Sequence, residues 1–195
     1  PDVLHLNHGS FGACPSQILE QQTLLRQQME SNTLRFFEQE LPELLETARK
    51  ALGLFLGAPA QDLVFVDNAT TGISTVLSNL GLTAGDRILV TDHGYNACSN
   101  AARYFTKRAS AEIDLINLPF PGSDANEFIE RILGACTSRT RLLLIDHITS
   151  PTALIMPLEA IVPAVQQRGI QVLVDGAHAP GMLPLRLAEL RPDYY

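Results

Sequence analysis

A carboxylate and an imidazole follow one of the most apolar short segments of the sequence. The residues QVLV (171–174) lead directly into Asp175, Gly176 and, in the stretch DGAHAPG, His178. Gly176 permits a sharp backbone turn, and the acid and the imidazole are close enough in sequence to share a ligand. Asp175 is therefore the leading candidate for a charged contact with a bound group.

The same arrangement, an apolar run followed by polar residues, occurs at three other places. DNATTG follows 63–66, TDHGYN follows 87–90, and DHITSPT follows 141–145. The carboxyl ends of parallel strands meet at one edge of a sheet, where ligands bind in open α/β folds. We call this edge the rim, and the polar side chains expected there are Asp67, Asn68, Thr70, Thr71, Asp92, His93, Tyr95, Asp146, His147, Ser150, Thr152, Asp175 and His178.

Several rim residues also have a purely structural explanation. An Asp after a strand is commonly a turn residue or a helix N-cap, which applies to Asp92 and Asp146. His93 and His147 could each be a partly buried histidine with satisfied hydrogen bonds. The residues alone leave both explanations open.

The NATTG segment before an apolar helix is a candidate anion site. Thr70 or Thr71 can cap that helix, while its first free N–H groups and the helix dipole face a ligand. Proteins hold phosphate in this way without a basic cluster. We therefore expect an anion at the backbone of Ala69 to Thr71.

The elements that must position these residues follow from the apolar periodicity. Helical periods span 16–31, with Ser16 as the expected N-cap, and 41–57, where Gly57 ends the helix. The apolar stripe expected on the second helix consists of Leu45, Ala48, Leu52 and Phe55. Five strands are expected after it, at 63–66, 87–90, 112–116, 141–145 and 171–174, with intervals long enough for helices. This βαβαβαβαβ order predicts a parallel sheet covered by helices on both faces.

Composition limits the class of protein. The 195 residues are 46% hydrophobic and carry a formal net charge of -7, which argues against nucleic acid or an anionic membrane as the main partner. Cys14, Cys98 and Cys136 are odd in number and widely spaced, so we expect a reducing, cytoplasmic location. We treat 1–195 as one partial domain, with 1–60 as an N-terminal segment and helices. The first residue is not Met and the sequence stops at RPDYY, so we expect a longer native chain.

Three common sites of α/β proteins are excluded by their missing motifs. The only lysines, Lys50 and Lys107, do not lie in a GxxxxGK[ST] phosphate loop, and DNATTG is not a GxGxxG dinucleotide turn. NHGSFG is not a GxSxG nucleophile turn. His5 and His8 are three residues apart, but no carboxylate or cysteine completes a metal site with them.

The motifs NATTG, DHGYN, HITSPTALIMP and VDGAHAPG occur in the order and spacing typical of the class V aminotransferase family, which the chain resembles over almost its whole length. The opening LNHGSFGACP resembles the isopenicillin N epimerase-like branch. The resemblance implies the three-layer αβα large domain of fold type I, mainly parallel and here incomplete, with pyridoxal 5'-phosphate (PLP) as cofactor. The small C-terminal domain of the family is missing from this sequence.

The resemblance also implies roles for individual residues. Asp175 matches the aspartate that pairs with the pyridine nitrogen, and His178 matches the position that hydrogen-bonds the ring phenolate oxygen. His93 matches the aromatic residue that stacks on the ring, although Tyr95 could serve if this branch is shifted by two residues. The remaining implied cofactor contacts are Ala69, Thr70, Thr71, Ser150 and Thr152, and contacts to substrate are assigned to Asn7, His8 and Ser10.

The Schiff-base lysine of the family should follow the next strand, and this sequence ends before it. We therefore expect a PLP-dependent enzyme that acts on an amino acid at the α-carbon, by epimerisation, transamination or lysis. It is expected to be a homodimer, and the chain as given is expected to be inactive. The alternatives are a non-catalytic domain that keeps the fold without the lysine, and a magnesium-dependent phosphotransfer domain that uses Asp146 and Asp175.

Overall fold

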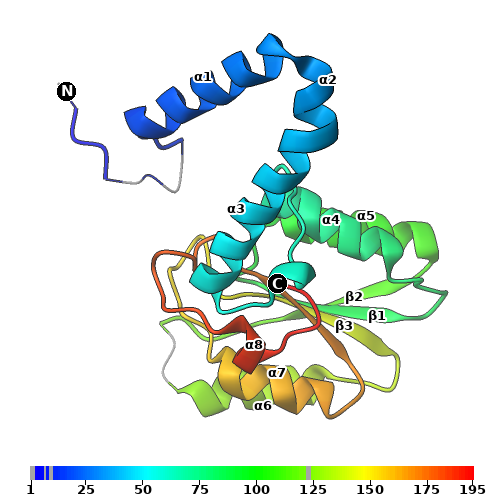
Figure 1. Ribbon diagram of the computed structural model, residues 1–195. Helices are drawn as coiled ribbons and strands as arrows, with labels where there is room; N and C mark the ends of the chain where they lie inside the picture. The colour runs from blue at the N-terminus through cyan, green and yellow to red at the C-terminus, as the bar shows by residue number, and fades with distance from the viewer. Residues whose placement is uncertain (1–2, 7, 9–10, 122–123) are drawn as a thin grey trace. The chain divides into compact units, whose positions relative to one another are not determined.

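The computed structural model describes residues 3–6, 8, 11–121 and 124–195 (Figure 1). The chain divides into two compact units. One comprises Pro1–Phe55 with Pro59–Leu63, and the other comprises Leu56–Ala58 with Val64–Tyr195.

The first unit is helical. It contains α1 (Ser16–Ser31), α2 (Thr33–Arg35), a π-helical turn (Phe36–Glu40), α3 (Leu41–Leu56, which crosses into the second unit) and a 3₁₀ turn (Ala60–Asp62). The expected N-cap at Ser16 is wrong, because Ser16 is the first helical residue and Pro15 precedes it without a side-chain cap. Pro has no N–H and a fixed φ, so it suits the start of a helix better than its interior.

The expected apolar stripe of α3 is not its buried face. Leu45, Ala48 and Phe55 are exposed and Leu52 is half-buried, whereas Leu56 is buried. Gly57 has a φ of 63°, in the left-handed region that glycine tolerates, so the expected end of the helix is confirmed. The 3.6-residue period was therefore sufficient to predict the helix, but not the face that packs.

The second unit is built on a parallel sheet. Its strands are β1 (Arg87–Thr91), β2 (Glu112–Ile116), β3 (Thr140–Asp146) and β4 (Gln171–Asp175), in the order β2-β1-β3-β4. Residues 63–66 do not form the expected fifth strand. They pair with no strand among the described residues, and Val64 is 82% exposed.

Helices cover both faces of this sheet, as expected (Figure 1). α4 (Ala69–Asn79) and α5 (Asn96–Ala109) lie on one face, and α6 (Ala125–Ala135) and α7 (Leu158–Gln166) lie on the other. A short helix, α8 (Leu187–Leu190), comes near the end of the chain. Alternate strand residues supply the two cores. Ile88, Val90, Leu142, Leu144 and Leu173 face α4 and α5, and Leu89, Leu143, Ile145, Val172 and Val174 face α6 and α7.

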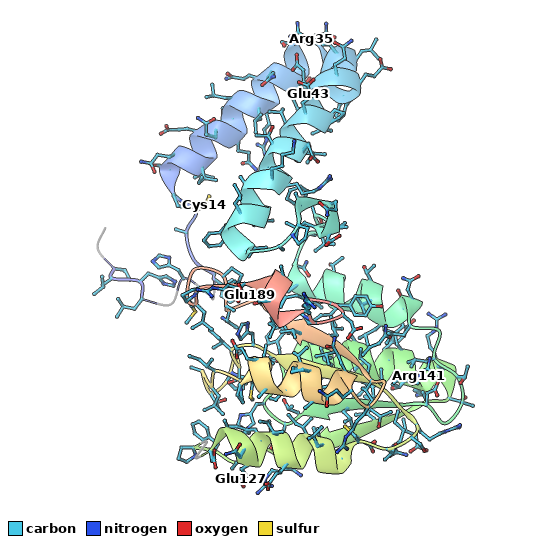
Figure 2. All side chains as sticks on the ribbon, turned by 60° about the horizontal axis from the view of Figure 1, so that its bottom comes forward. Cys14, Arg35, Glu43, Glu127, Arg141 and Glu189 are labelled. Atoms are coloured by element: carbon cyan, nitrogen blue, oxygen red, sulfur yellow. The ribbon has the colours of Figure 1, made fainter. Side chains whose placement is uncertain are left out.

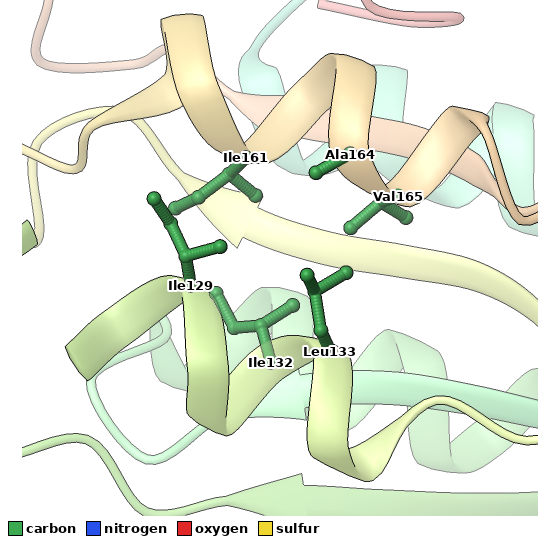
Figure 3. A pocket seen from close by; sticks show the side chains of 6 residues that line it. All are labelled: Ile129, Ile132, Leu133, Ile161, Ala164 and Val165. Atoms are coloured by element: carbon green, nitrogen blue, oxygen red, sulfur yellow. The ribbon is translucent and has the colours of Figure 1, made fainter. Parts of the chain in front are cut away.

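The contact between α6 and α7 is apolar throughout. Figure 3 shows the side chains that meet there, namely Ile129, Ile132, Leu133, Ile161, Ala164 and Val165. Charged side chains lie outside this contact, and Figure 2 labels Glu127 on α6 and Arg141 on β3. No helix of the described residues is both long enough and apolar enough to cross a membrane.

Ile161→Ala should destabilise the second unit by about 2–5 kcal/mol, because Ile161 is 1% exposed and its removal leaves a gap in the contact of Figure 3. Ile155→Ala is the matched control, since this side chain is 58% exposed and its loss should change stability by only about 0.5 kcal/mol. Urea unfolding followed by circular dichroism measures both. Equal losses of stability would show that the α6–α7 contact is not tightly packed.

Candidate functional site

The order in which the chain adds strands to the sheet reverses between β1 and β3. From β1 the chain moves outward to β2, and from β3 it moves the opposite way to β4. The connections after β1 and β3 therefore diverge at the carboxyl ends of these two strands, which is where open α/β sheets bind their ligands. Residues from both connections, and from the turn after β4, build the candidate site.

Asp175 ends β4 and is only 5% exposed. Its Oδ1 accepts a hydrogen bond from the backbone N–H of Ala177 at 3.1 Å, and its Oδ2 accepts one from Sγ of Cys98, also at 3.1 Å. A carboxylate has about four acceptor positions, so two of them remain for a ligand. The carboxylate is thus held through both oxygens and can still accept a hydrogen bond.

A second buried carboxyl lies beside it. Asp146 ends β3, is 4% exposed, and is the register partner of Asp175 across the two strands. Burial, and to a smaller extent the charge of Asp175, raise the pKa of Asp146 to about 7, although hydrogen bonds from the backbone N–H groups of Tyr95 and Ser150 act in the opposite direction. Asp146 therefore carries a proton in a substantial fraction of molecules at neutral pH.

Neither carboxyl has a cationic partner in the described part of the chain. Among the described residues, every lysine or arginine ion pair lies elsewhere in the chain. A buried carboxylate that receives only neutral donors is costly unless a ligand supplies positive charge. The pair of acids therefore fits a ligand with a protonated ring nitrogen, which is the group that PLP would present to Asp175.

The start of α4 leaves backbone donors free at the proposed anion position. The expected Thr cap is wrong: Asn68 caps the helix, and its Oδ1 accepts from the N–H of Thr71 at 2.9 Å. Ala69 and Thr70 open the first turn, so their N–H groups have no acceptor within the helix. The amide of Thr71 is already committed to the cap, so Ala69 and Thr70 are the better-placed donors.

His93 is buried at the rim and fixed by both ring nitrogens. Nε2 lies 3.2 Å from the backbone oxygen of Leu118, and Nδ1 lies 2.9 Å from Oγ1 of Thr152. A carbonyl only accepts, so in the neutral ring Nε2 carries the proton and Nδ1 accepts from Thr152. Tyr95, the other candidate for stacking, is 47% exposed. The orientation of the His93 ring is therefore fixed by the protein.

The expected contacts to the ring oxygen differ in their availability. The hydroxyl of Thr152 is shared between His93 and Thr149, which lies 2.7 Å away. Ser150 is exposed, and His178 is half-buried in the turn after β4. In the described part of the chain His178 forms no side-chain hydrogen bond, so its ring nitrogens can serve a ligand.

Two features of this region were not predicted from the sequence. The first is the contact of Cys98 with Asp175 described above. The second is Tyr195, whose hydroxyl lies 3.0 Å from Nδ1 of His147, while burial raises the pKa of the tyrosine and lowers that of the histidine. The Tyr195 ring also occupies the space that a Cβ on Gly176 would need, so this glycine serves close packing.

Lys107 lies in the last turn of α5, about 16 Å along a helix that begins beside the rim. Lys50 belongs to α3 in the first unit, and its side chain is 68% exposed. His8 is exposed, with its ring against His5, and the predicted substrate contacts Asn7 and Ser10 lie outside the described residues.

Sequence comparison finds relatives along the whole chain. Residues 13–195 match the family "Aminotransferase class-V". Isopenicillin N epimerase of Streptomyces clavuligerus is 34% identical over 195 residues, which are all of this chain and 49% of that protein. A probable chloroplastic L-cysteine desulfhydrase of Arabidopsis thaliana is 30% identical over 210 residues, covering 100% of this chain and 44% of the relative. The chain thus spans about half the length of the curated relatives it matches.

Solved structures share the fold. The cystine C-S lyase C-DES, in complex with its product cysteine persulfide, superposes with a TM-score of 0.88 at 25% identity, over 96% of this chain and 51% of that one. Another C-DES structure, a mutant with glycine covalently linked to the PLP cofactor, gives the same TM-score and identity, with 50% of that chain covered. The Escherichia coli cysteine desulfurase CsdA shares the fold with a TM-score of 0.78, over 97% of this chain and 48% of that one, at 22% identity.

These findings agree with the observed sheet and with the motifs at its rim. The matching region covers both the helical first unit from residue 13 and the entire parallel sheet. The predicted fold class is confirmed as part of the large domain of fold type I. The chain belongs to the aminotransferase class-V family of PLP-dependent enzymes.

Proposed function

We propose that this chain is the cofactor-binding part of a PLP-dependent enzyme that acts on an amino acid at its α-carbon. The observation that carries the proposal is the buried pair Asp146 and Asp175, which has no cationic partner among the described residues. A protonated pyridine ring supplies the missing positive charge. The curated relatives, an epimerase and a desulfhydrase, support amino-acid chemistry of this kind.

Each group at the rim has a role in this proposal. Asp175 holds the proton on the ring nitrogen, and the free amides of Ala69 and Thr70 receive the phosphate. His178 and Ser150 are proposed to hydrogen-bond the ring oxygen, and His93 is proposed to stack on the cofactor face with a ring that its own hydrogen bonds orient. When bound, PLP supplies an electron-withdrawing ring that stabilises negative charge at the substrate α-carbon.

The lysine that bonds the cofactor covalently is proposed to lie outside these 195 residues. Lys107 is at the far end of α5, and the relatives are about twice as long as this chain. The lysine would also be the base that moves the α-proton, so we propose that the chain alone turns over no substrate. Whether the complete protein epimerises, transaminates or cleaves its substrate depends on groups beyond this chain.

We further propose that the protein is a cytoplasmic homodimer. α1 has no buried residue, although it carries exposed apolar side chains, including Ile18, Leu19 and Leu24. Burial of such a surface against a second copy would remove it from water. The free thiols of Cys14, Cys98 and Cys136 fit a reducing compartment.

Two alternative functions follow from the sequence, and experiment distinguishes them from the proposed one. A non-catalytic domain would share the fold and could bind the cofactor without any lysine in the complete protein. A magnesium-dependent phosphotransfer domain would use the same two acids, but neither the family match nor the relatives described above support it.

Titration of the chain with equimolar PLP tests the proposal. The visible absorbance of PLP should shift on binding, and borohydride reduction followed by peptide mass spectrometry should find no adduct on Lys50 or Lys107. The reason is that neither lysine belongs to the rim. Absence of any binding would refute the proposed function, and a stoichiometric adduct on either lysine would place the cofactor elsewhere.

The same titration distinguishes Asp175 from another acid of the rim. Asp175→Asn should weaken PLP binding by about tenfold or more, since a hydrogen bond to a charged partner contributes about 1.5–3 kcal/mol. Asp92→Asn is the matched control, because Asp92 accepts from the N–H of Leu118 and an amide oxygen can do the same. If the two substitutions weakened PLP binding equally, Asp175 would not be the partner of the ring nitrogen.

Asp146 should make the stability of the cofactor-free chain depend on pH. Its pKa is raised on folding, so its contribution to stability is fully present below about pH 4 and is lost as the pH rises through about 7. Asp146→Asn cannot ionise, so its stability relative to wild type should rise over this range by on the order of a few kcal/mol. Urea unfolding from pH 4 to 8 measures the difference, and parallel curves for the two proteins would contradict the raised pKa.

A further inference from the structure

Cys98 is a buried thiol at the start of α5. It is the third residue of that helix, is 2% exposed, and packs in the apolar core between the sheet and the helices α4 and α5. Most residues around it in this core are aliphatic. A thiol that only filled space there would need no polar partner.

The sulfur nevertheless has two polar neighbours from different elements. Its Sγ–H donates to Oδ2 of Asp175 at 3.1 Å, and the hydroxyl of Thr70 hydrogen-bonds the sulfur. Thr70 belongs to the turn whose amides face the proposed phosphate, and Asp175 is the proposed partner of the ring nitrogen. One thiol therefore links the two ends of the proposed cofactor site.

The thiol keeps its proton in this position. Burial raises the pKa of Cys98, and the hydrogen bond to Asp175 and the charges of Asp175 and Asp146 raise it further, while Thr70 acts weakly in the opposite direction. A thiolate would add a third negative charge to a buried pair of acids. Cys98 is thus a neutral hydrogen-bond donor to the carboxylate.

The consequence for Asp175 is a fixed carboxylate. Ala177 donates to one oxygen and Cys98 to the other, so rotation of the carboxylate breaks both hydrogen bonds. A carboxylate held in this way does not need to be ordered when a ligand arrives, and the cost of binding falls accordingly. The acceptor positions of the Asp175 carboxylate that remain free therefore keep a fixed direction.

We propose that Cys98 is a positioning residue of the cofactor site, whose thiol orients the Asp175 carboxylate toward the ring nitrogen and ties it to Thr70 at the start of α4. This inference rests on the proposed function, because it assigns Cys98 a role toward the same cofactor. Cys98 touches Asp175 and Thr70, and it acts through them.

Cys136 provides a matched control within the same unit. Its thiol is partly buried and donates to the backbone oxygen of Ile132 at 3.3 Å, one turn earlier along the chain. Replacement of Cys136 therefore removes the same atoms and a similar hydrogen bond, away from the rim. The paired variants are Cys98→Ala with Cys98→Ser, and Cys136→Ala with Cys136→Ser.

Infrared spectroscopy of the cofactor-free chain tests the contact itself. The S–H stretching band that disappears in Cys98→Ser should move to higher frequency in Asp175→Asn, because an amide oxygen is a weaker acceptor than a carboxylate. The band that disappears in Cys136→Ser should stay in place. A Cys98 band that does not move on Asp175→Asn would overturn the proposal, whatever the chain binds.

Cofactor titrations test the positioning role. Cys98→Ala should weaken PLP binding by about three- to tenfold, since a thiol is a weak donor and acts indirectly. Cys98→Ser should restore binding to within about twofold, because the hydroxyl can donate to the same oxygen. Both Cys136 variants should bind like wild type.

An analogue of PLP with C–H in place of the ring nitrogen separates positioning from general damage to the fold. The loss on Cys98→Ala should be smaller for this analogue than for PLP, because the analogue has no proton for Asp175 to hold. Equal losses for the two compounds, or wild-type binding of PLP by Cys98→Ala, would overturn the proposal and leave the proposed function standing. No PLP binding by the wild-type chain would refute the proposed function, and the role of Cys98 with it.

Discussion

Two neighbouring strands of this protein end in buried carboxyl groups, and the described part of the chain supplies no cation to either. Asp146 and Asp175 are register partners, so the hydrogen bonds of the sheet hold their backbones side by side. Burial and the nearby charge of Asp175 both disfavour the ionised form of Asp146 and raise its pKa, so this carboxyl tends to keep a proton. A cationic ligand is the other way to relieve the same repulsion.

The rest of the sheet unit supports this pair. Backbone N–H groups of Tyr95 and Ser150 point at Asp146, and the N–H of Ala177 points at Asp175. All three donors come from the connections that follow β1, β3 and β4, so the topology of the sheet brings them together. The thiol of Cys98 contacts both Asp175 and Thr70, and so it connects this carboxylate to the start of α4, where the backbone amides are free. This arrangement supports the proposed ligand, which has a positive ring and a negative tail.

Local patterns were enough to predict most of the sheet and the polar rim, because a buried parallel strand is a short apolar run and the residues after it are exposed to a ligand. The same reasoning failed at 63–66, since an apolar run becomes a strand only when a partner strand lies beside it, and sequence periodicity does not show partners. The cap of α4 at Asn68 was missed because both Asn and Thr are good N-caps. Residue preference alone therefore does not decide at which of these neighbouring residues the helix begins. The contact between Cys98 and Asp175 joins residues 77 positions apart, and it depends on the rotation of α5 against the sheet.

The most direct test of the central claim is the protonation state of the cofactor's ring nitrogen when it is bound to this chain. PLP labelled with ¹⁵N at that nitrogen, titrated into the wild-type chain above the pH at which free PLP loses this proton, gives a chemical shift that differs strongly between a protonated and an unprotonated ring. The buried acids predict the shift of a protonated ring that persists at a pH at which free PLP has lost this proton. An unprotonated ring nitrogen in the bound state would contradict the account, because the two carboxyl groups would then be buried beside a ligand that gives them no positive charge.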